Sequence, residues 1–164
     1  SYKVGPIRKR DGDVEYLESL DVLLVPHDFS LTCSAMWQAM VQVHQRPGRE
    51  QYRGPVDVLI HLVTRRYVEA GRTVMVWRAM TEGEDEFSGM HSDEFGWCVI
   101  RPNQSNPTMP TVMETFARFI PMSVASHVED KAHADQFAMF VVTSGEDDGA
   151  EISRMMEALL LDDS

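Results

Sequence analysis

The middle of this sequence carries successive strand-like segments with no helical pattern between them. Each segment is rich in apolar and β-branched residues and is bounded by turn-forming residues. Strands that follow one another without helical crossovers pair in antiparallel fashion. The order therefore predicts an α+β fold built on an antiparallel sheet, with Ala70–Arg72 as a three-residue hairpin loop. The predicted strands are Tyr2–Ile7, Val14–Val25, Val56–Glu69, Thr73–Thr81, Gly96–Arg101, Thr111–Ile120 and Gln136–Thr143.

Two other segments have helical spacing. Between Asp28, a suitable N-cap, and Pro47, apolar residues recur at intervals of three and four, which predicts an amphipathic helix. Apolar residues recur in the same way over Ile152–Leu160, which predicts a terminal helix. The polar, glycine-containing segment Ser144–Gly149 is expected to end the last strand, with its acidic residues just before this helix.

Charge and hydropathy exclude several function classes. The 164 residues carry 15 Lys+Arg and 26 Asp+Glu, a formal net charge of −11. Because proteins that bind nucleic acid gather Lys and Arg on one face, we expect no nucleic-acid partner. No apolar run approaches the ~20 residues that span a bilayer, so we expect no integral membrane insertion, and transient membrane contact stays open. The length predicts one domain covering residues 1–164.

Cysteine usage and the N-terminus bear on location. Cys33 and Cys98 lie in apolar surroundings, which predicts two reduced, buried thiols and not a disulfide. The first residues contain no apolar signal segment. Together these features predict an intracellular, cytoplasmic protein.

Large apolar side chains recur at a period of two in three of the predicted strands and at helical spacing in the terminal helix. The sequence contains 11 Met, a deformable residue that fills irregular apolar space. Such side chains line either an ordinary core or an internal cavity for an apolar ligand, and the pattern fits both. The candidate ligand-binding residues are Met75, Trp77, Met113, Phe119, Phe137, Met139, Met155, Met156 and Leu159.

Six segments share a characteristic pattern of turns and aromatic residues: Val25–Phe29, Ala35–Trp37, Val68–Ala79, Glu86–His91, Gly96–Pro102 and Ile152–Leu161. Together they resemble a START-like lipid-binding domain of the Bet v 1-like superfamily, and are most similar to a divergent branch found in eukaryotic microbes. The resemblance implies a helix-grip fold, in which a curved antiparallel sheet wraps around a long C-terminal helix and encloses a tunnel of lipid or sterol size. It also implies that the domain lacks the N-terminal helix and strand of the full family.

Motifs for chemistry are weak. His127–Asp135 contains two imidazoles and three carboxylates, but its spacing matches no established metal motif, and we interpret it as a polar connection. His91–Glu94 offers either a base–carboxylate pair or a polar loop, and we favour the loop. His61 is expected in the core or a pocket wall. No nucleophile elbow and no phosphate-binding loop occurs, so we predict no catalytic residue, metal or cofactor.

We therefore expect non-catalytic binding of a hydrophobic ligand, lipid- or sterol-like, in an internal cavity, for transport or sensing. Two alternatives remain open. One is a regulatory or interaction module without a bound lipid, and the other is an enzyme that uses the same cavity, which rests on fold-level analogy.

Overall fold

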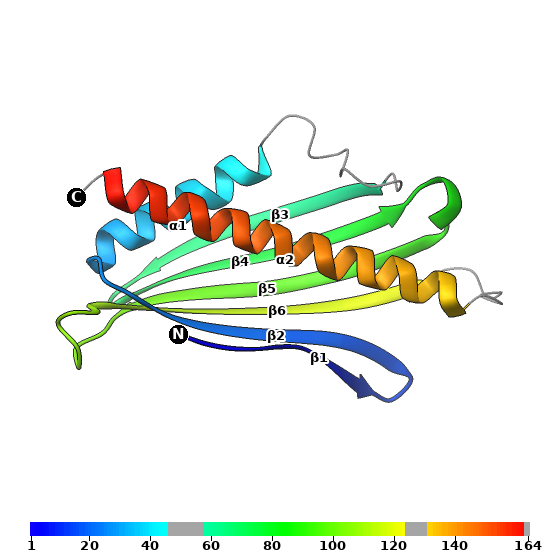
Figure 1. The fold of residues 1–164 in the computed structure, drawn as a ribbon, viewed down its shortest axis with the longest axis horizontal. Coiled ribbons are helices and arrows are strands. Elements are labelled where there is room, and N and C mark those ends of the chain that lie inside the picture. Colours follow the sequence, from blue (N-terminus) through cyan, green and yellow to red (C-terminus); the bar gives the residue numbers. More distant parts are fainter. Residues whose placement is uncertain (46–57, 124–130, 163–164) are drawn as a thin grey trace.

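The computed structural model describes residues 1–45, 58–123 and 131–162. In this part of the chain, six strands form one curved antiparallel sheet, and two helices lie against one face of it (Figure 1). The predicted α+β class is confirmed, and a sheet packed on a long C-terminal helix is the helix-grip arrangement. The elements are β1 (Tyr2–Asp11), β2 (Val14–Val25), α1 (Phe29–His44), β3 (Val58–Glu69), β4 (Arg72–Gly83), a short 3₁₀ helix η1 (Asp85–Phe87), β5 (Met90–Pro102), β6 (Thr111–Ser123) and α2 (Lys131–Asp162).

The strands are ordered β1-β2-β6-β5-β4-β3, and each pairs antiparallel with its neighbours. Helix α1 carries the chain from β2 to the opposite edge, where β3 begins. The loop between β3 and β4 is shorter than predicted, because Glu69 pairs with Arg72 and leaves only two residues, Ala70 and Gly71, outside the ladder. Gly71 permits this tight turn through its positive φ of 82°.

The prediction for Gln136–Thr143 is wrong: this segment is helical and belongs to the 32-residue helix α2. Phe137 and Val141, four residues apart, lie on one helix face and are both buried, whereas Met139 is 60% exposed. The acidic segment Ser144–Gly149, predicted as a turn, continues the same helix. Apolar contacts at both ends of α2 hold it helical through a stretch of low intrinsic helix propensity.

Two apolar clusters hold the helices on the sheet. The first joins α1 and the C-terminal half of α2 to the sheet around Met75, Cys98 and Ile100. The second joins the N-terminal half of α2 to the sheet and η1 around Phe87, Phe119 and Phe137. Helix α2 therefore contacts a separate cluster near each of its ends, and its middle belongs to neither.

The opposite face of the sheet carries no helix in the described residues, but its side chains make aromatic and ionic contacts with one another. Trp97 and Phe116 stack with their ring centroids 5.5 Å apart. The Arg118 guanidinium lies over the Tyr16 ring and donates a hydrogen bond to Glu18 through Nε at 2.8 Å. Glu18, only 11% exposed at its side chain, also accepts a hydrogen bond from the Lys9 ammonium.

Both cysteines are free, as predicted, but only Cys98 is fully buried, whereas Cys33 is half-buried. Burial raises the pKa of the Cys98 thiol to about 12, and it also raises the pKa of Cys33. Among the described residues, neither helix combines the length and the apolarity that a membrane span requires.

Candidate ligand-binding cavity

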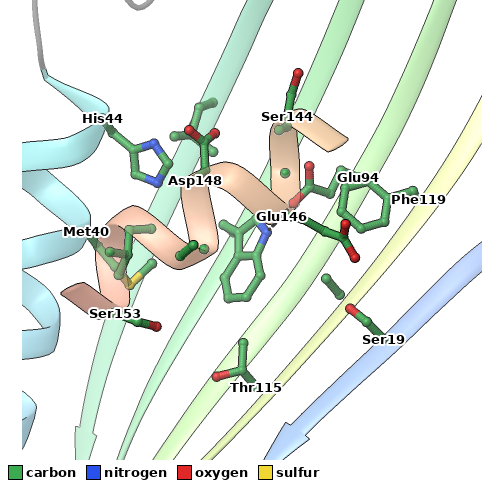
Figure 2. Close-up of a pocket in the computed structure, with 18 of the residues that line it drawn as sticks. Ser19, Met40, His44, Glu94, Thr115, Phe119, Ser144, Glu146, Asp148 and Ser153 are labelled. Carbon is green, nitrogen blue, oxygen red and sulfur yellow. Dashed lines mark hydrogen bonds between the residues drawn. The ribbon is translucent and has the colours of Figure 1, made fainter. Parts of the chain in front are cut away.

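A cavity of ≈ 310 Å³ lies between the sheet and the middle of α2 (Figure 2). Its floor is the helix-facing side of the sheet, from Ser19 on β2 to Ile60 on β3. The C-terminal half of α1 closes one side through Met40 and His44. The volume falls at the lower end of the range for small-molecule sites, about 300–1,000 Å³.

The cavity exists because the apolar face of α2 is interrupted. Along this helix, the positions facing the sheet are occupied by Phe137, Val141, Ser144, Asp148 and Ile152, spaced by three or four residues. The two central residues are small or polar, where the flanking positions carry large apolar side chains. The helix therefore reaches the sheet at both ends and leaves space beneath its middle.

Glycines in the same stretch act in two ways. Gly145 packs closely against Phe119: a Cβ added at position 145 would lie only 2.9 Å from two carbons of the ring. An added Cβ at Gly149 would meet nothing within 4 Å. No close contact requires glycine at position 149, yet glycine in a helix interior is less favourable than alanine by about 1 kcal/mol. Gly149 lines the cavity, so the missing side chain adds to the open space.

Small residues in the sheet also leave space above the floor of the cavity. Ala79 and Ala117 line the cavity, and Gly96 pairs with Trp77 on the neighbouring strand. A Cβ at position 96 would collide with the Trp77 ring, so the indole lies directly over the bare backbone of β5. The indole Nε1 donates a hydrogen bond of 2.9 Å to Glu94 Oε1, which fixes the ring in the cavity floor.

Most of the charged side chains in the lining are acidic. Glu94 projects from β5, and Glu146 and Asp148 project from α2, as Figure 2 shows. Glu94 and Asp148 are half-buried and Glu146 is exposed. Figure 2 also shows His44 of α1 pointing to the same part of the cavity as Asp148.

The nine candidate residues divide into groups. Trp77, Met113 and Phe119 line the cavity. Met75, Phe137 and Met156 are buried in the two clusters, and Met155 and Leu159 pack half-buried against the first. The prediction that Met139 lies on the same inner face as Phe137 is wrong, because residues two apart share a face in a strand but not in a helix. Met139 lies on the exposed side of α2.

Sequence reasoning misses the polar lining of α2 and the role of α1. Composition predicts that Ser144 and Asp148 lie in a turn. Their positions nevertheless continue the three- and four-residue spacing that runs from Phe137 and Val141 to Ile152. That continuous spacing of three and four is the signal that identifies them. Met36 and Met40 of α1 also line the cavity, and the helical pattern of that segment predicts the helix without indicating a site.

The remaining polar candidates fall elsewhere. His91–Glu94 is part of β5 and not a loop: Asp93 pairs with Arg78 at 2.8 Å, and Glu94 lines the cavity. His61 is exposed on β3, 3.9 Å from Glu82, and not in the core, because it alternates with the cavity-lining Ile60 and Leu62.

His127–Asp135 falls partly outside the described residues. Residues 131–135 form the first turns of α2 and not an extended connection. Within 1–45, 58–123 and 131–162, no group of three or more His, Cys, Asp or Glu side chains is arranged to hold a metal ion.

Comparisons with known proteins give structural similarity at low sequence identity. A scan against protein-family models finds no match, and a search of curated proteins finds none either. A structure of an uncharacterised protein from Rhizobium leguminosarum is similar at 11% identity and a TM-score of 0.45, covering 93% of this chain and 99% of that one.

Two further structures are similar over most of the chain. A protein of unknown function from Staphylococcus aureus has 11% identity and a TM-score of 0.37, with 90% of this chain and 98% of that chain covered. A protein from Thermus thermophilus has 10% identity and a TM-score of 0.38, with 91% and 99% covered. At these identities the likeness concerns the fold alone.

Proposed function

We propose that this chain is a START-like domain that binds a small, mostly apolar molecule in the cavity beneath α2, as a carrier or sensor and without catalysis. The observation that carries the proposal is the interruption of the α2 apolar face above a floor of small residues. An ordinary core would place large side chains at positions 144 and 148, as the same helix does on either side.

Unfilled apolar space inside a folded protein is energetically unfavourable. Side chains around a void lose dispersion contacts with the atoms that would fill it. A guest molecule that contacts Met40, Met113 and Phe119 restores these contacts and buries apolar surface, at about 25 cal/mol per Å². The sequence resemblance to START-like lipid-binding domains supports the same class of ligand.

The test measures binding of a neutral single-chain probe, dodecanol, by isothermal titration calorimetry. Ala117 lies on the cavity floor between Ser19 and Gly96 on the neighbouring strands. Ala117→Leu places extra methyl groups in the cavity and should weaken binding at least about tenfold, equivalent to 1.4 kcal/mol. The matched control is Ala158→Leu, at an exposed position of α2 outside the cavity, which should bind as the parent chain does.

Ala117→Leu should keep or raise the melting temperature, because it fills space in a folded protein. The proposal fails if dodecanol shows no saturable binding to the parent chain. It also fails if a folded Ala117→Leu variant binds with unchanged affinity. Native mass spectrometry of the purified protein gives a second readout, since a co-purified ligand would add a discrete mass that Ala117→Leu loses.

A further inference from the structure

The charged residues that line the cavity indicate which kind of apolar ligand it prefers. This inference rests on the proposed binding function. We infer that the preferred ligand is a cationic amphiphile, an apolar body that carries a protonated amine or a quaternary ammonium group. Three features of the cavity favour such a ligand: the position of Asp148, the hydrogen bond between Glu94 and Trp77, and the balance of charge in the lining.

Asp148 occupies a position that apolar packing would otherwise fill. It follows Phe137, Val141 and Ser144 on the sheet-facing side of α2 and precedes Ile152. A carboxylate at this place directs negative potential into the cavity, and apolar walls strengthen that potential because they lower the local dielectric. An ammonium group in the cavity would lie close to this carboxylate and be attracted to it.

Glu94 and Trp77 supply a second recognition element from the floor of the cavity. The hydrogen bond of 2.9 Å from the indole Nε1 orients the Glu94 carboxylate beside the ring. Aromatic faces attract ammonium groups through their quadrupole, and a carboxylate next to the ring adds to this attraction. The pair therefore combines two groups that both favour a cation and neither of which favours an anion.

The basic side chains in the lining do not reverse this preference. Lys3 is exposed on the edge strand β1, and its register partner on β2 is Asp21, which also lines the cavity, so this edge contributes one positive and one negative charge. Among the described residues that line the cavity, Glu94, Glu146 and Asp148 share it with one further basic group, the imidazole of His44. An acyl chain with a carboxylate head would bring a like charge into this field.

The test compares three probes that share one dodecyl chain: dodecyltrimethylammonium, dodecanol and dodecanoate. At physiological salt and below micelle formation, calorimetry should show the ammonium binding about tenfold more tightly than the alcohol. The carboxylate should bind more weakly than the alcohol. Asp148→Asn and Glu94→Gln should each lower the ratio of ammonium affinity to dodecanol affinity about five- to tenfold, and their circular dichroism spectra and melting temperatures show that the variants are folded. Asp147→Asn is the matched control, since Asp147 is exposed on the same helix and does not line the cavity.

The outcomes separate this inference from the proposed function. If dodecanol binds but the ammonium binds no more tightly, or dodecanoate binds best, the cationic preference is wrong and the cavity remains a site for neutral or anionic ligands. If Asp148→Asn and Glu94→Gln both retain the full ammonium affinity, the assignment of these carboxylates is wrong. If dodecanol does not bind the parent chain, the proposed function itself fails.

Discussion

At the scale of single residues, Glu18 shows how the face of the sheet opposite α1 and α2 is stabilised. Its carboxylate lies between the Lys9 ammonium and the Arg118 guanidinium, and Arg118 also stacks over Tyr16. The hydrogen bond from Lys9 is the main cause of the lowered pKa of Glu18. Burial raises this pKa, but the bond from Arg118 lowers it further. The network ties β1, β2 and β6 together on that face.

We predict that Glu18→Gln lowers the melting temperature more than Glu15→Gln does, because the Glu15–Arg8 pair is exposed at both side chains and separated by 3.4 Å. Since the folded-state pKa of Glu18 lies below its unfolded value, its stabilising contribution is present above that unfolded value, near 4.5. The contribution is lost as the pH falls through the folded pKa. The melting temperature, measured between neutral and strongly acidic pH, should fall less steeply with acidification in Glu18→Gln than in the parent chain. An equally steep fall in both proteins would contradict this prediction.

At the scale of elements, the residues of α2 that leave the cavity open also lower the intrinsic stability of the helix. Its central segment contains two glycines and three acidic residues, and this composition disfavours a helix taken alone. The two apolar clusters nevertheless hold both ends of α2 on the sheet. The segment is therefore helical through its tertiary contacts and not through its own propensity.

The two glycines of α2 should respond differently to alanine. Gly149→Ala should stabilise the fold by about 1 kcal/mol, because the new methyl group meets open space and the helix gains propensity. Gly145→Ala should gain less or lose stability, because its Cβ would press on the buried Phe119 ring at 2.9 Å. Urea denaturation of both variants measures the difference. Equal stabilisation by the two substitutions would show that Phe119 moves freely.

The same segment explains how far the sequence alone can lead. The strands from Val14 to Ile120, apart from the beginning of β5, and the first helix are predictable, because each alternates or repeats its apolar residues and is bounded by clear turn or cap residues. Gln136–Thr143 fits both periods, and Ser144–Gly149 has the composition of a turn. The prediction fails there because contacts with residues distant in sequence decide the outcome. The cavity depends on the same contacts, so composition alone does not reveal the acidic lining of α2.

At the scale of the whole molecule, the cavity lies between the two apolar clusters. Met40 and Met113 border the cavity from the first cluster, and Phe119 and Val141 border it from the second. A bound molecule would contact both groups at once. Binding would therefore couple the two clusters and oppose local unfolding of either one alone.

We predict that a cavity ligand raises the melting temperature of the whole domain in a single transition. A ligand that binds the folded state at a hundred times its Kd stabilises it by about 2.7 kcal/mol, or roughly 5–10 °C for a domain of this size. Scanning calorimetry with and without the probe measures the shift. At the same probe concentration, Ala117→Leu should show at most about half of this shift, because a tenfold weaker Kd leaves about 1.4 kcal/mol of stabilisation. Ala158→Leu should show the full shift. A shift that is equal in both variants would place the ligand elsewhere.

The indole of Trp77, lying on the bare backbone of Gly96 and bound to Glu94, also gives the protein a built-in optical reporter. Tryptophan emission depends on the polarity around the ring, and this ring borders the space that a guest would enter. The chain contains 3 Trp, so replacing Trp37 and Trp97 by phenylalanine would leave one emitter at the floor of the cavity. Its spectrum would then follow the exchange of water for a guest without any attached dye.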